Sequence, residues 1–211
     1  MKEKIILLGR GGHAKSVVDV IEASGNYTII GFIDKAEERN FEYRGYSIIG
    51  CDADLLKFYK AGIHHAFVCI GFLGQGNIRD LLYDRLKQIG YHLPVLTDPT
   101  AVLASDVQVG EGSFIGKRAV INSGAAIGKM AIINTSAVVE HDSKVGGFSH
   151  ISVNSTLCGE VSVGKKCFVG AGSTIVQGIK IGNNCLIGAG SVVLKDVMSG
   201  KKVYGIVKEN G

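Results

Sequence analysis

The sequence predicts an α/β domain followed by an all-β parallel β-helix, and three observations lead to this prediction. Strand-like and helix-like segments alternate over roughly the first hundred residues. From Leu103 to Val193, every sixth residue is Leu, Ile or Val. The 211 residues include 30 glycines and only 2 prolines, and the glycines of the second half are regularly spaced. Because the period changes near residues 97–101, we place the two domains at residues 1–98 and 99–211, the second ending in a short tail.

In the first domain, the apolar run "KIILLG" is typical of a buried strand. The segment "HAKSVVDVIEAS" then has apolar residues at helical spacing, and "YTIIGFID" predicts a second strand. The alternation continues through "SIIG", a helix near residues 52–60, "AFVCIG", "NIRDLLYDRLKQIG" and "PVLTD". Alternating strands and helices indicate a parallel sheet covered on both faces, so we expect a small Rossmann-like domain.

The second domain repeats a six-residue unit. Its aliphatic positions are Leu103, Val109, Ile115, Ile121, Ile127, Ile133, Val139, Val145, Ile151, Leu157, Val163, Val169, Ile175, Ile181, Ile187 and Val193. The residue two places earlier is mostly small, as at Ser113 and Ala119, and we expect it to point inward as well. The residue after each aliphatic is most often Gly or Asn, which tolerate positive φ, so it is expected to form a corner. Three such units make a coil, and about five coils with strands roughly 4.8 Å apart give a triangular parallel β-helix.

Composition excludes several classes of protein. The net charge is +4 without a basic tract, which argues against nucleic-acid binding. No apolar run approaches the roughly 18 residues of a membrane span. The N-terminal segment lacks a signal-peptide cleavage pattern, and the five cysteines form no CxxC pair, so we expect a cytoplasmic protein with reduced thiols.

A glycine loop, "GRGGHA", joins the first strand to the first helix. Gly9 and Gly11 match the start of G-x-G-x-x-G, a turn that lets backbone N–H groups and a helix N-terminus approach a phosphate. Asp34 ends the second strand, where an acid can bind a ribose. Taken alone, the loop predicts NAD and an oxidoreductase, or a nucleotide-binding regulatory module. The domain has too few elements for a full dinucleotide fold, so a nucleotide-linked sugar is favoured, with His13, Asp34 and Lys35 facing its base, ribose or sugar hydroxyls.

The segment "VVEHDSKVGGFSH" holds the most reactive side chains of the second domain. His141 lies two places after an inward valine, hence at a corner, and Gly159, one coil later, leaves space beside it. A neutral histidine is the usual base for an amine or hydroxyl that attacks a thioester, and a neighbouring carboxylate stabilises the imidazolium. Asp142 is the first candidate for this carboxylate and Glu140 the second. His150 precedes an inward residue, so we expect it on an outer flat face, near another subunit's site.

Two other functions use a similar solenoid. A zinc hydratase needs three histidines at a subunit interface, but the solenoid holds only two, so no metal is expected. A structural solenoid of the ice-binding kind would show repeated outward threonine ladders, which are absent from the sequence.

The chain resembles the NeuD/PglD family of bacterial sugar O-/N-acetyltransferases over nearly its full length. The residues that carry the resemblance are "GRGGHAKSVVDVI", "FIDK", "CIG", "NIR" and "IINTSAVVEHDSKVGGFSHISVNSTLCGEVSVG". The resemblance implies a left-handed β-helix, a homotrimer, and acetyl-CoA as the co-substrate. It also implies roles for matching residues: His141 as the base with Asp142 raising its basicity; Gly11, Gly12, His13, Asp34, Lys35 and Gly71 as substrate-binding; and His150, Ala171 and Ala189 as acetyl-CoA-binding.

The chain departs from the family pattern beside two of these places. "CIGFLGQGNIR" adds residues after Gly71, and "VYGIVKENG" lacks the Gly-x-Pro-Ala segment, with Val207 in place of the proline. The favoured acceptor is an amino group of a nucleotide-linked deoxyamino sugar, because a phosphate-binding loop needs a phosphate. O-acetylation of sialic acid is the alternative.

Overall fold

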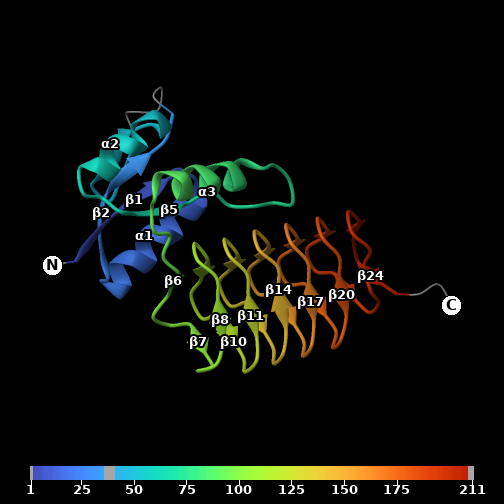
Figure 1. Ribbon diagram of the computed structural model, residues 1–211. Helices are drawn as coiled ribbons and strands as arrows, with labels where there is room; N and C mark the ends of the chain where they lie inside the picture. The colour runs from blue at the N-terminus through green and yellow to red at the C-terminus, as the bar shows by residue number, and fades with distance from the viewer. Residues whose placement is uncertain (1, 36–40, 209–211) are drawn as a thin grey trace. The chain divides into compact units, whose positions relative to one another are not determined.

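The computed structural model describes residues 2–35 and 41–208 of the chain. The chain divides into two compact units (Figure 1). The α/β unit comprises Met1–Gly71 with Gly76–Leu96, and the solenoid unit comprises Phe72–Gln75 with Thr97–Gly211. Four residues that interrupt the α/β unit in the sequence, Phe72–Gln75, therefore group with the solenoid. Among the helices in the described parts of the chain, none combines the length and the hydrophobicity that a membrane span requires.

The α/β unit has one sheet with strand order β3-β4-β2-β1-β5. Its strands are β1 (Glu3–Leu8), β2 (Tyr27–Ile33), β3 (Glu42–Tyr43), β4 (Tyr46–Gly50) and β5 (His65–Val68). Its helices are α1 (Gly12–Ser24), the 3-10 turn η2 (Asp52–Asp54), α2 (Leu55–Lys60) and α3 (Ile78–Ile89). The central pairs are parallel, and only β3 runs antiparallel to β4. The predicted α/β fold class is therefore confirmed.

Apolar side chains on both faces of the sheet explain this fold. The four residues Ile5 to Leu8 of β1 are at most 1% exposed, so the central strand is buried on both faces. Helix α1 buries Val17, Val18 and Ile21, the apolar residues whose spacing predicts the helix. Each fully buried aliphatic side chain contributes about 1.5–3 kcal/mol relative to exposure. The α/β unit therefore has its own hydrophobic core.

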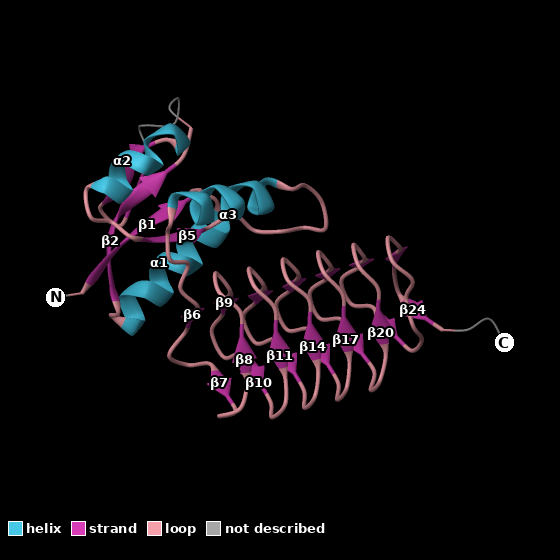
Figure 2. Cartoon of the chain, in the orientation of Figure 1, coloured by secondary structure: helices cyan, strands magenta, loops and turns pink. Residues whose placement is uncertain are grey.

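The solenoid has three parallel sheets of two-residue strands (Figure 2). Sheet I contains β6 (Leu96–Thr97), β9 (Phe114–Ile115), β12 (Ile132–Ile133), β15 (His150–Ile151), β18 (Phe168–Val169), β21 (Leu186–Ile187) and β23 (Lys202–Val203). Sheet II contains β7 (Val102–Leu103), β10 (Val120–Ile121), β13 (Val138–Val139), β16 (Thr156–Leu157), β19 (Thr174–Ile175), β22 (Val192–Val193) and β24 (Ile206–Val207). Sheet III contains β8 (Gln108–Val109), β11 (Ala126–Ile127), β14 (Lys144–Val145), β17 (Ser162–Val163) and β20 (Lys180–Ile181).

The six-residue period places one residue of each strand in the core. Val120 pairs with Val138, and Ile121 with Val139, so one coil is 18 residues. Most of the sixteen aliphatic positions are at most 4% exposed, and the small residues two places earlier are buried as well. Inward serines are satisfied by backbone: Ser149 Oγ donates to Gly164 O at 2.8 Å and accepts from Cys167 N at 2.9 Å. The predicted β-helix is confirmed, and its core is a stack of aliphatic and small side chains.

Two details of the sequence prediction need correction. The "PVLTD" segment forms β6, which pairs in sheet I of the solenoid and not in the sheet of the α/β unit. The residues directly after the aliphatic positions, most often glycine, do not have positive φ. Positive φ occurs two residues after them, at positions such as Asp142 and Glu160. A Cβ at Gly116 or Gly128 would instead lie within 2.9 Å of the backbone of the next coil. Close stacking of coils, not corner conformation, therefore requires glycine there.

Candidate active site

The turn between sheets II and III carries His141. Strand β13 ends at Val139, and Glu140, His141 and Asp142 form the turn before β14. The N–H of Asp142 donates to Ser123 O at 3.0 Å in the preceding coil. The N–H of Glu160 donates to His141 O at 2.9 Å from the following coil. Both neighbouring coils therefore fix the backbone on which the imidazole stands.

Asp142, and not Glu140, is the carboxylate that the ring contacts. His141 Nδ1 lies 2.9 Å from Asp142 Oδ2, whereas the Glu140 carboxylate accepts the backbone N–H of His141 at 3.2 Å. Asp142 has φ +58°, and this left-handed backbone directs its carboxylate back to the preceding ring. Because a carboxylate only accepts, Nδ1 carries the proton, and in the neutral ring Nε2 keeps a lone pair. The ring is half exposed, at 50%.

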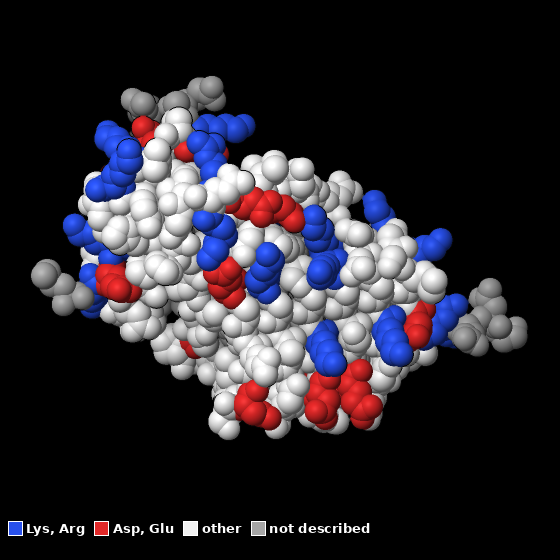
Figure 3. Space-filling model, in the orientation of Figure 1, with Lys and Arg blue, Asp and Glu red and all other residues white. Residues whose placement is uncertain are grey.

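The pKa of His141 is raised above the ordinary histidine value. The hydrogen bond to Asp142 is the largest cause, partial desolvation acts in the opposite direction, and three negative charges add to the rise. These charges belong to Asp142, Glu140 and Glu160. Figure 3 shows acidic side chains along the lower edge of the solenoid. The turns between sheets II and III carry Asp106, Glu140, Asp142 and Glu160. The acidic edge therefore favours a protonated His141.

Two glycines make room for this pair. A Cβ at Gly159 would lie 2.5 Å from His141 Nε2. A Cβ at Gly124, one coil earlier than Asp142, would lie 2.5 Å from Asp142 Oδ1. The predicted space beside the imidazole is thus present at Gly159, and Gly124 provides an equivalent space for the carboxylate, which the sequence reasoning missed. The 18-residue spacing was the signal that could have identified it.

His150 has an environment different from the one expected for an exposed face. It points out of the solenoid core from β15, but it is only 7% exposed. Its Nδ1 contacts Phe72 O at 2.7 Å, and its Nε2 contacts Asn134 Nδ2 at 3.1 Å. The predicted outward direction therefore holds, and the contacts with Phe72 O and the Phe168 ring explain why the side chain is nevertheless buried. Its role in binding acetyl-CoA stays a prediction.

Ala171 and Ala189 occupy equivalent turns between sheets I and II. They are 18 residues apart, and the N–H of Gly190 donates to Ala171 O at 2.8 Å. Ala171 is half-buried and Ala189 is exposed. These turns lie along one edge of sheet II, whereas His141 lies along the opposite edge. The structure therefore separates the two predicted groups by the width of a sheet within one chain.

The predicted substrate residues of the α/β unit gather at the carboxyl ends of neighbouring strands. The glycine loop follows β1, and Gly11 is the N-cap of α1 without a side-chain cap. A Cβ at Gly11 or Gly12 would meet nothing within 4 Å, so both glycines face open space. Gly71 follows β5, and a Cβ there would be 3.9 Å from His13 Cβ. Gly11, Gly12, His13 and Gly71 thus form one cluster.

Asp34 follows β2 and is already paired within the chain. Its Oδ2 lies 3.8 Å from Arg10 Nε, and its Oδ1 accepts the N–H of Lys35 at 2.7 Å. The Arg10 guanidinium also lies 5.4 Å from the ring centre of Phe41. Arg10 is a residue that the sequence reasoning did not select, although it lies inside the glycine loop. Lys35 is exposed.

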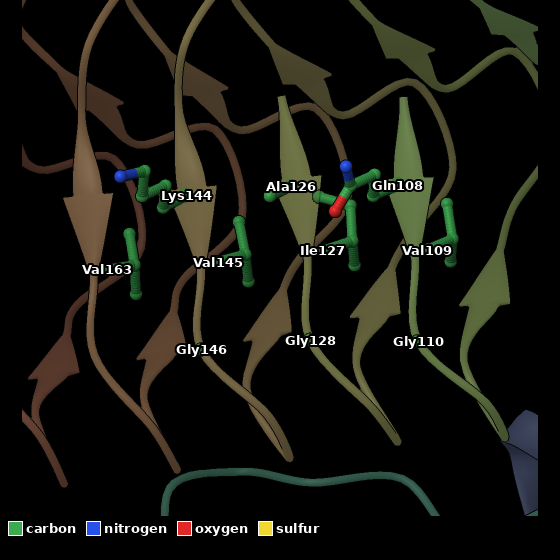
Figure 4. Close-up of a pocket in the computed structure, with 10 residues that line it drawn as sticks. All are labelled: Gln108, Val109, Gly110, Ala126, Ile127, Gly128, Lys144, Val145, Gly146 and Val163. Atoms are coloured by element: carbon green, nitrogen blue, oxygen red, sulfur yellow. The ribbon is translucent and has the colours of Figure 1, made fainter. Parts of the chain in front are cut away.

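A shallow hollow on sheet III lies outside this set of residues. Gln108 and Lys144 stand on either side of Ala126, and glycines of the following turns form one end (Figure 4). None of the predicted site residues lines it. Among residues 2–35 and 41–208, no group of three or more His, Cys, Asp or Glu side chains is placed to hold a metal ion.

Known protein families match the sequences of both units. Residues 4–86 match the PglD N-terminal domain, and residues 106–140 and 160–195 match the hexapeptide repeat of succinyl-transferase. The structure of PerB from Caulobacter crescentus, in complex with CoA and GDP-perosamine, is 34% identical with a TM-score of 0.89, covering 96% of this chain and 94% of that chain. The acetyltransferase domain of PglB from Neisseria gonorrhoeae, in complex with acetyl coenzyme A, is 30% identical with a TM-score of 0.89, covering 97% of each chain.

A viral protein is also similar over part of its length. It is the uncharacterized protein L142 of Acanthamoeba polyphaga mimivirus, 30% identical over 117 residues, which are 56% of this chain and 22% of that protein. The chain thus matches less than a quarter of this curated relative. PerB, by contrast, is matched over nearly its whole length at more than 30% identity. The chain therefore belongs to the NeuD/PglD family of acetyl-CoA-dependent sugar acetyltransferases.

Proposed function

We propose that this protein transfers the acetyl group of acetyl-CoA to an amino group of a nucleotide-linked deoxyamino sugar, with His141 as the general base. The observation that carries this proposal is the 2.9 Å contact between His141 Nδ1 and Asp142 Oδ2. In the neutral ring, this contact occupies Nδ1 and leaves the lone pair of Nε2, on the side of Gly159, to accept a proton. Family membership favours acyl transfer over the NAD-dependent alternative.

The proton transfers follow from this geometry. As the amine nitrogen forms its bond to the thioester carbonyl carbon, Nε2 of His141 accepts the proton that the amine loses. The carbon–sulfur bond then breaks, and the same Nε2 can return the proton to the departing thiolate. Asp142 keeps the ring in the reactive tautomer and stabilises the imidazolium between these two steps. The products are the acetylated amine and free CoA.

The loop after β1 and the N-terminus of α1 support a nucleotide-linked acceptor. The N-terminus of α1 and the open space at Gly11 and Gly12 suit a diphosphate, because helix N-termini attract anions. Arg10, in the same loop, adds a positive charge. A phosphate-free acceptor would not use these features. PerB, the similar protein, was crystallised with a nucleotide-linked sugar.

We also propose that the active enzyme is a homotrimer, because the predicted site is divided within one chain. His141 and Asp142 lie on the edge between sheets II and III, whereas Ala171 and Ala189 lie on the edge between sheets I and II. We propose that three copies turn their sheets II toward a common axis. In this arrangement the edge of one copy that carries His141 comes next to the edge of its neighbour that carries Ala171 and Ala189. Acetyl-CoA would then lie between copies.

The three faces of the solenoid support this choice of sheet II. On sheet I, the outward side chains of Phe114 and Ile132 are at most 2% exposed. On sheet III, Lys144 and Lys180 are exposed charges that require hydration. On sheet II, the outward residues are all β-branched: Val102, Val120, Val138, Thr156, Thr174, Val192 and Ile206. Removing such a row of mostly apolar side chains from water costs little free energy, so it can pack against the same row in another copy.

The acceptor is tested with a panel that comprises GDP-perosamine, a UDP-linked 4-amino sugar and free sialic acid, each with acetyl-CoA. Release of free thiol measures the rate, and the product mass identifies N- or O-acetylation. We expect turnover with at least one nucleotide-linked amino sugar. Turnover with free sialic acid alone would overturn the proposal in favour of O-acetylation. Sedimentation equilibrium tests the trimer, and a monomer with full activity would contradict it.

A further inference from the structure

The turns between sheets II and III stack on one another, and hydrogen bonds join each turn to the next. The N–H of Asp142 donates to Ser123 O of the preceding turn at 3.0 Å, and the equivalent bond recurs in each later turn up to Gly178. One turn earlier the pattern differs, because the N–H of Gly124 donates to the side-chain oxygen Asp106 Oδ2, also at 3.0 Å. The carboxylate of Asp106 therefore takes the place that a backbone carbonyl has in the later turns.

Asp106 binds two neighbouring donors with one oxygen. Its Oδ2 accepts the hydroxyl of Ser123 at 2.8 Å as well as the N–H of Gly124. The hydrogen bond from the Ser123 hydroxyl, followed by that from the Gly124 N–H, lowers the pKa of Asp106, so the carboxylate is charged at neutral pH. Gly124, at φ +74°, has no side chain of its own to restrict this exposed turn. Asp106 supplies the restraint instead.

The segment that Asp106 holds lies directly against Asp142. Ser123 O accepts the N–H of Asp142, and a Cβ at Gly124 would lie 2.5 Å from Asp142 Oδ1 and 3.3 Å from its Cγ. The carboxylate of Asp142 therefore rests on the backbone of Gly124, while its other oxygen, Oδ2, contacts His141 Nδ1 at 2.9 Å. A movement of Ser123 and Gly124 would change the distance between this carboxylate and the imidazole.

We infer that Asp106 is a positioning residue that acts through Ser123 and Gly124 to hold the Asp142 carboxylate against His141. Asp106 binds the turn, and the turn in its place supports the acid. The inference rests on the proposed function for the role of His141 as the general base. A residue two coils before the base thereby affects the proton transfer.

The action of Asp106 comes from its contacts and not from its charge. The carboxylates whose charges raise the pKa of His141 are those of Asp142, Glu140 and Glu160. Asp106 lies in the turn two coils before that of His141, which is about 10 Å along the solenoid. Between exposed groups at this separation, salt screens most of the electrostatic interaction. A neutral side chain that keeps the same hydrogen bonds should therefore hold the turn equally well.

Two substitutions at this position separate contact from charge. Asp106→Asn removes the charge but keeps an oxygen that can accept both donors, whereas Asp106→Ala removes both hydrogen bonds. We expect Asp106→Ala to lower kcat roughly threefold, the effect of one weakened hydrogen bond. It should also move the acidic limb of the kcat/KM profile to lower pH, because a displaced Asp142 raises the pKa of His141 less. Asp106→Asn should change neither quantity.

A titration without substrates keeps the test independent of the proposed function. The chain has six histidines, and the imidazole signal of His141 in an NMR spectrum is identified by its loss in His141→Ala. We expect its pKa to be lower in Asp106→Ala than in the wild type and unchanged in Asp106→Asn. Ser123→Ala removes only the hydroxyl donor and should give a smaller decrease. Asp196→Ala is the matched control and should have no effect, because the exposed Asp196 also accepts a backbone N–H, that of Lys180 at 2.8 Å, near the other end of the solenoid.

The contrary results are distinct. An unchanged titration of His141 in both Asp106→Ala and Ser123→Ala would overturn the inference, and a loss of thermal stability alone would leave Asp106 only a structural role. An equal decrease in Asp106→Asn would overturn it as well, because the effect would then come from charge. A wild-type protein that acetylates no acceptor of the panel would refute the proposed function, while the titration would still decide whether Asp106 positions Asp142.

Discussion

The two units of this chain position their functional side chains in opposite ways. In the solenoid, His141 is positioned by repetition: its backbone bonds to the coil before and the coil after, and glycines one coil away leave the room its side chain and its partner need. In the α/β unit, the glycine loop, Gly71 and Asp34 are brought together only because β1, β2 and β5 are neighbours in one sheet.

This difference decides how each site tolerates change. A solenoid residue has counterparts at intervals of 18 residues, so neighbouring coils supply matched controls in the same geometry. A loop residue at the end of a strand has no counterpart, and its surroundings depend on strand order. Substitutions in the solenoid should therefore act locally on the catalytic pair, whereas those in the glycine loop should act on ligand approach. Four predictions test this contrast.

The largest effect is expected at the base itself. His141→Ala should lower kcat by about 10²- to 10⁴-fold, the usual contribution of a positioned proton acceptor, while CoA binding persists. Steady-state thiol release and CoA titration measure the two quantities. Gln177→Ala, at the same turn position two coils later, is the control and should retain wild-type kcat. Near-normal kcat in His141→Ala would refute the assignment.

A smaller but still large loss is expected from Gly159→Ala. The added methyl would overlap His141 Nε2, and because the ring is half exposed, it can rotate away. We expect kcat to fall roughly tenfold to a hundredfold with little change in thermal unfolding, since a displaced base loses much of its catalytic contribution. The control is Gln177→Ala, at the same turn position as Gly159 one coil later and without positive φ. Equal activity of both variants would contradict the steric argument.

The third prediction concerns pH. A general base works when deprotonated, and the Asp142 hydrogen bond raises the pKa of His141, so kcat/KM of the wild-type enzyme should begin to fall at a higher pH than for an unperturbed histidine. Asp142→Asn removes this effect and should move the acidic limb of the profile to lower pH, with a modest loss of maximal rate. Asparagine tolerates the positive φ of this position, so the backbone should be retained. An unshifted limb would show that another group controls the profile.

The smallest effect belongs to the α/β unit. Gly11→Ala adds a methyl group that meets no protein atom, so its effect should appear only when a ligand approaches. We expect KM for the nucleotide-linked sugar to rise roughly fivefold, as when one hydrogen bond is lost, with kcat and KM for acetyl-CoA unchanged. Gly9→Ala is the contrasting variant, since its φ of +95° and its contact with Ile70 should make it destabilising. Unaltered sugar KM in Gly11→Ala would argue against phosphate binding at this loop.

Strand order and loop contacts explain what sequence reasoning missed. The pairing of Arg10 with Asp34 depends on β1 and β2 being adjacent, which no local pattern encodes. The burial of His150 depends on Phe72, 78 residues away. The "PVLTD" strand fits either unit by its apolar character, and only its place beside β9 assigns it to the solenoid.

The six-residue period alone determined the solenoid, the inward residues, and the corner position of His141 beside Gly159. Such a repeat is local: each coil contacts only its neighbours, so spacing along the chain converts directly into position in space. Only the tertiary structure decided which carboxylate meets the imidazole, because that choice depends on the left-handed backbone of Asp142. It alone also showed that His150 is covered, since contacts between distant segments follow from how the whole chain packs and not from the order of a few residues.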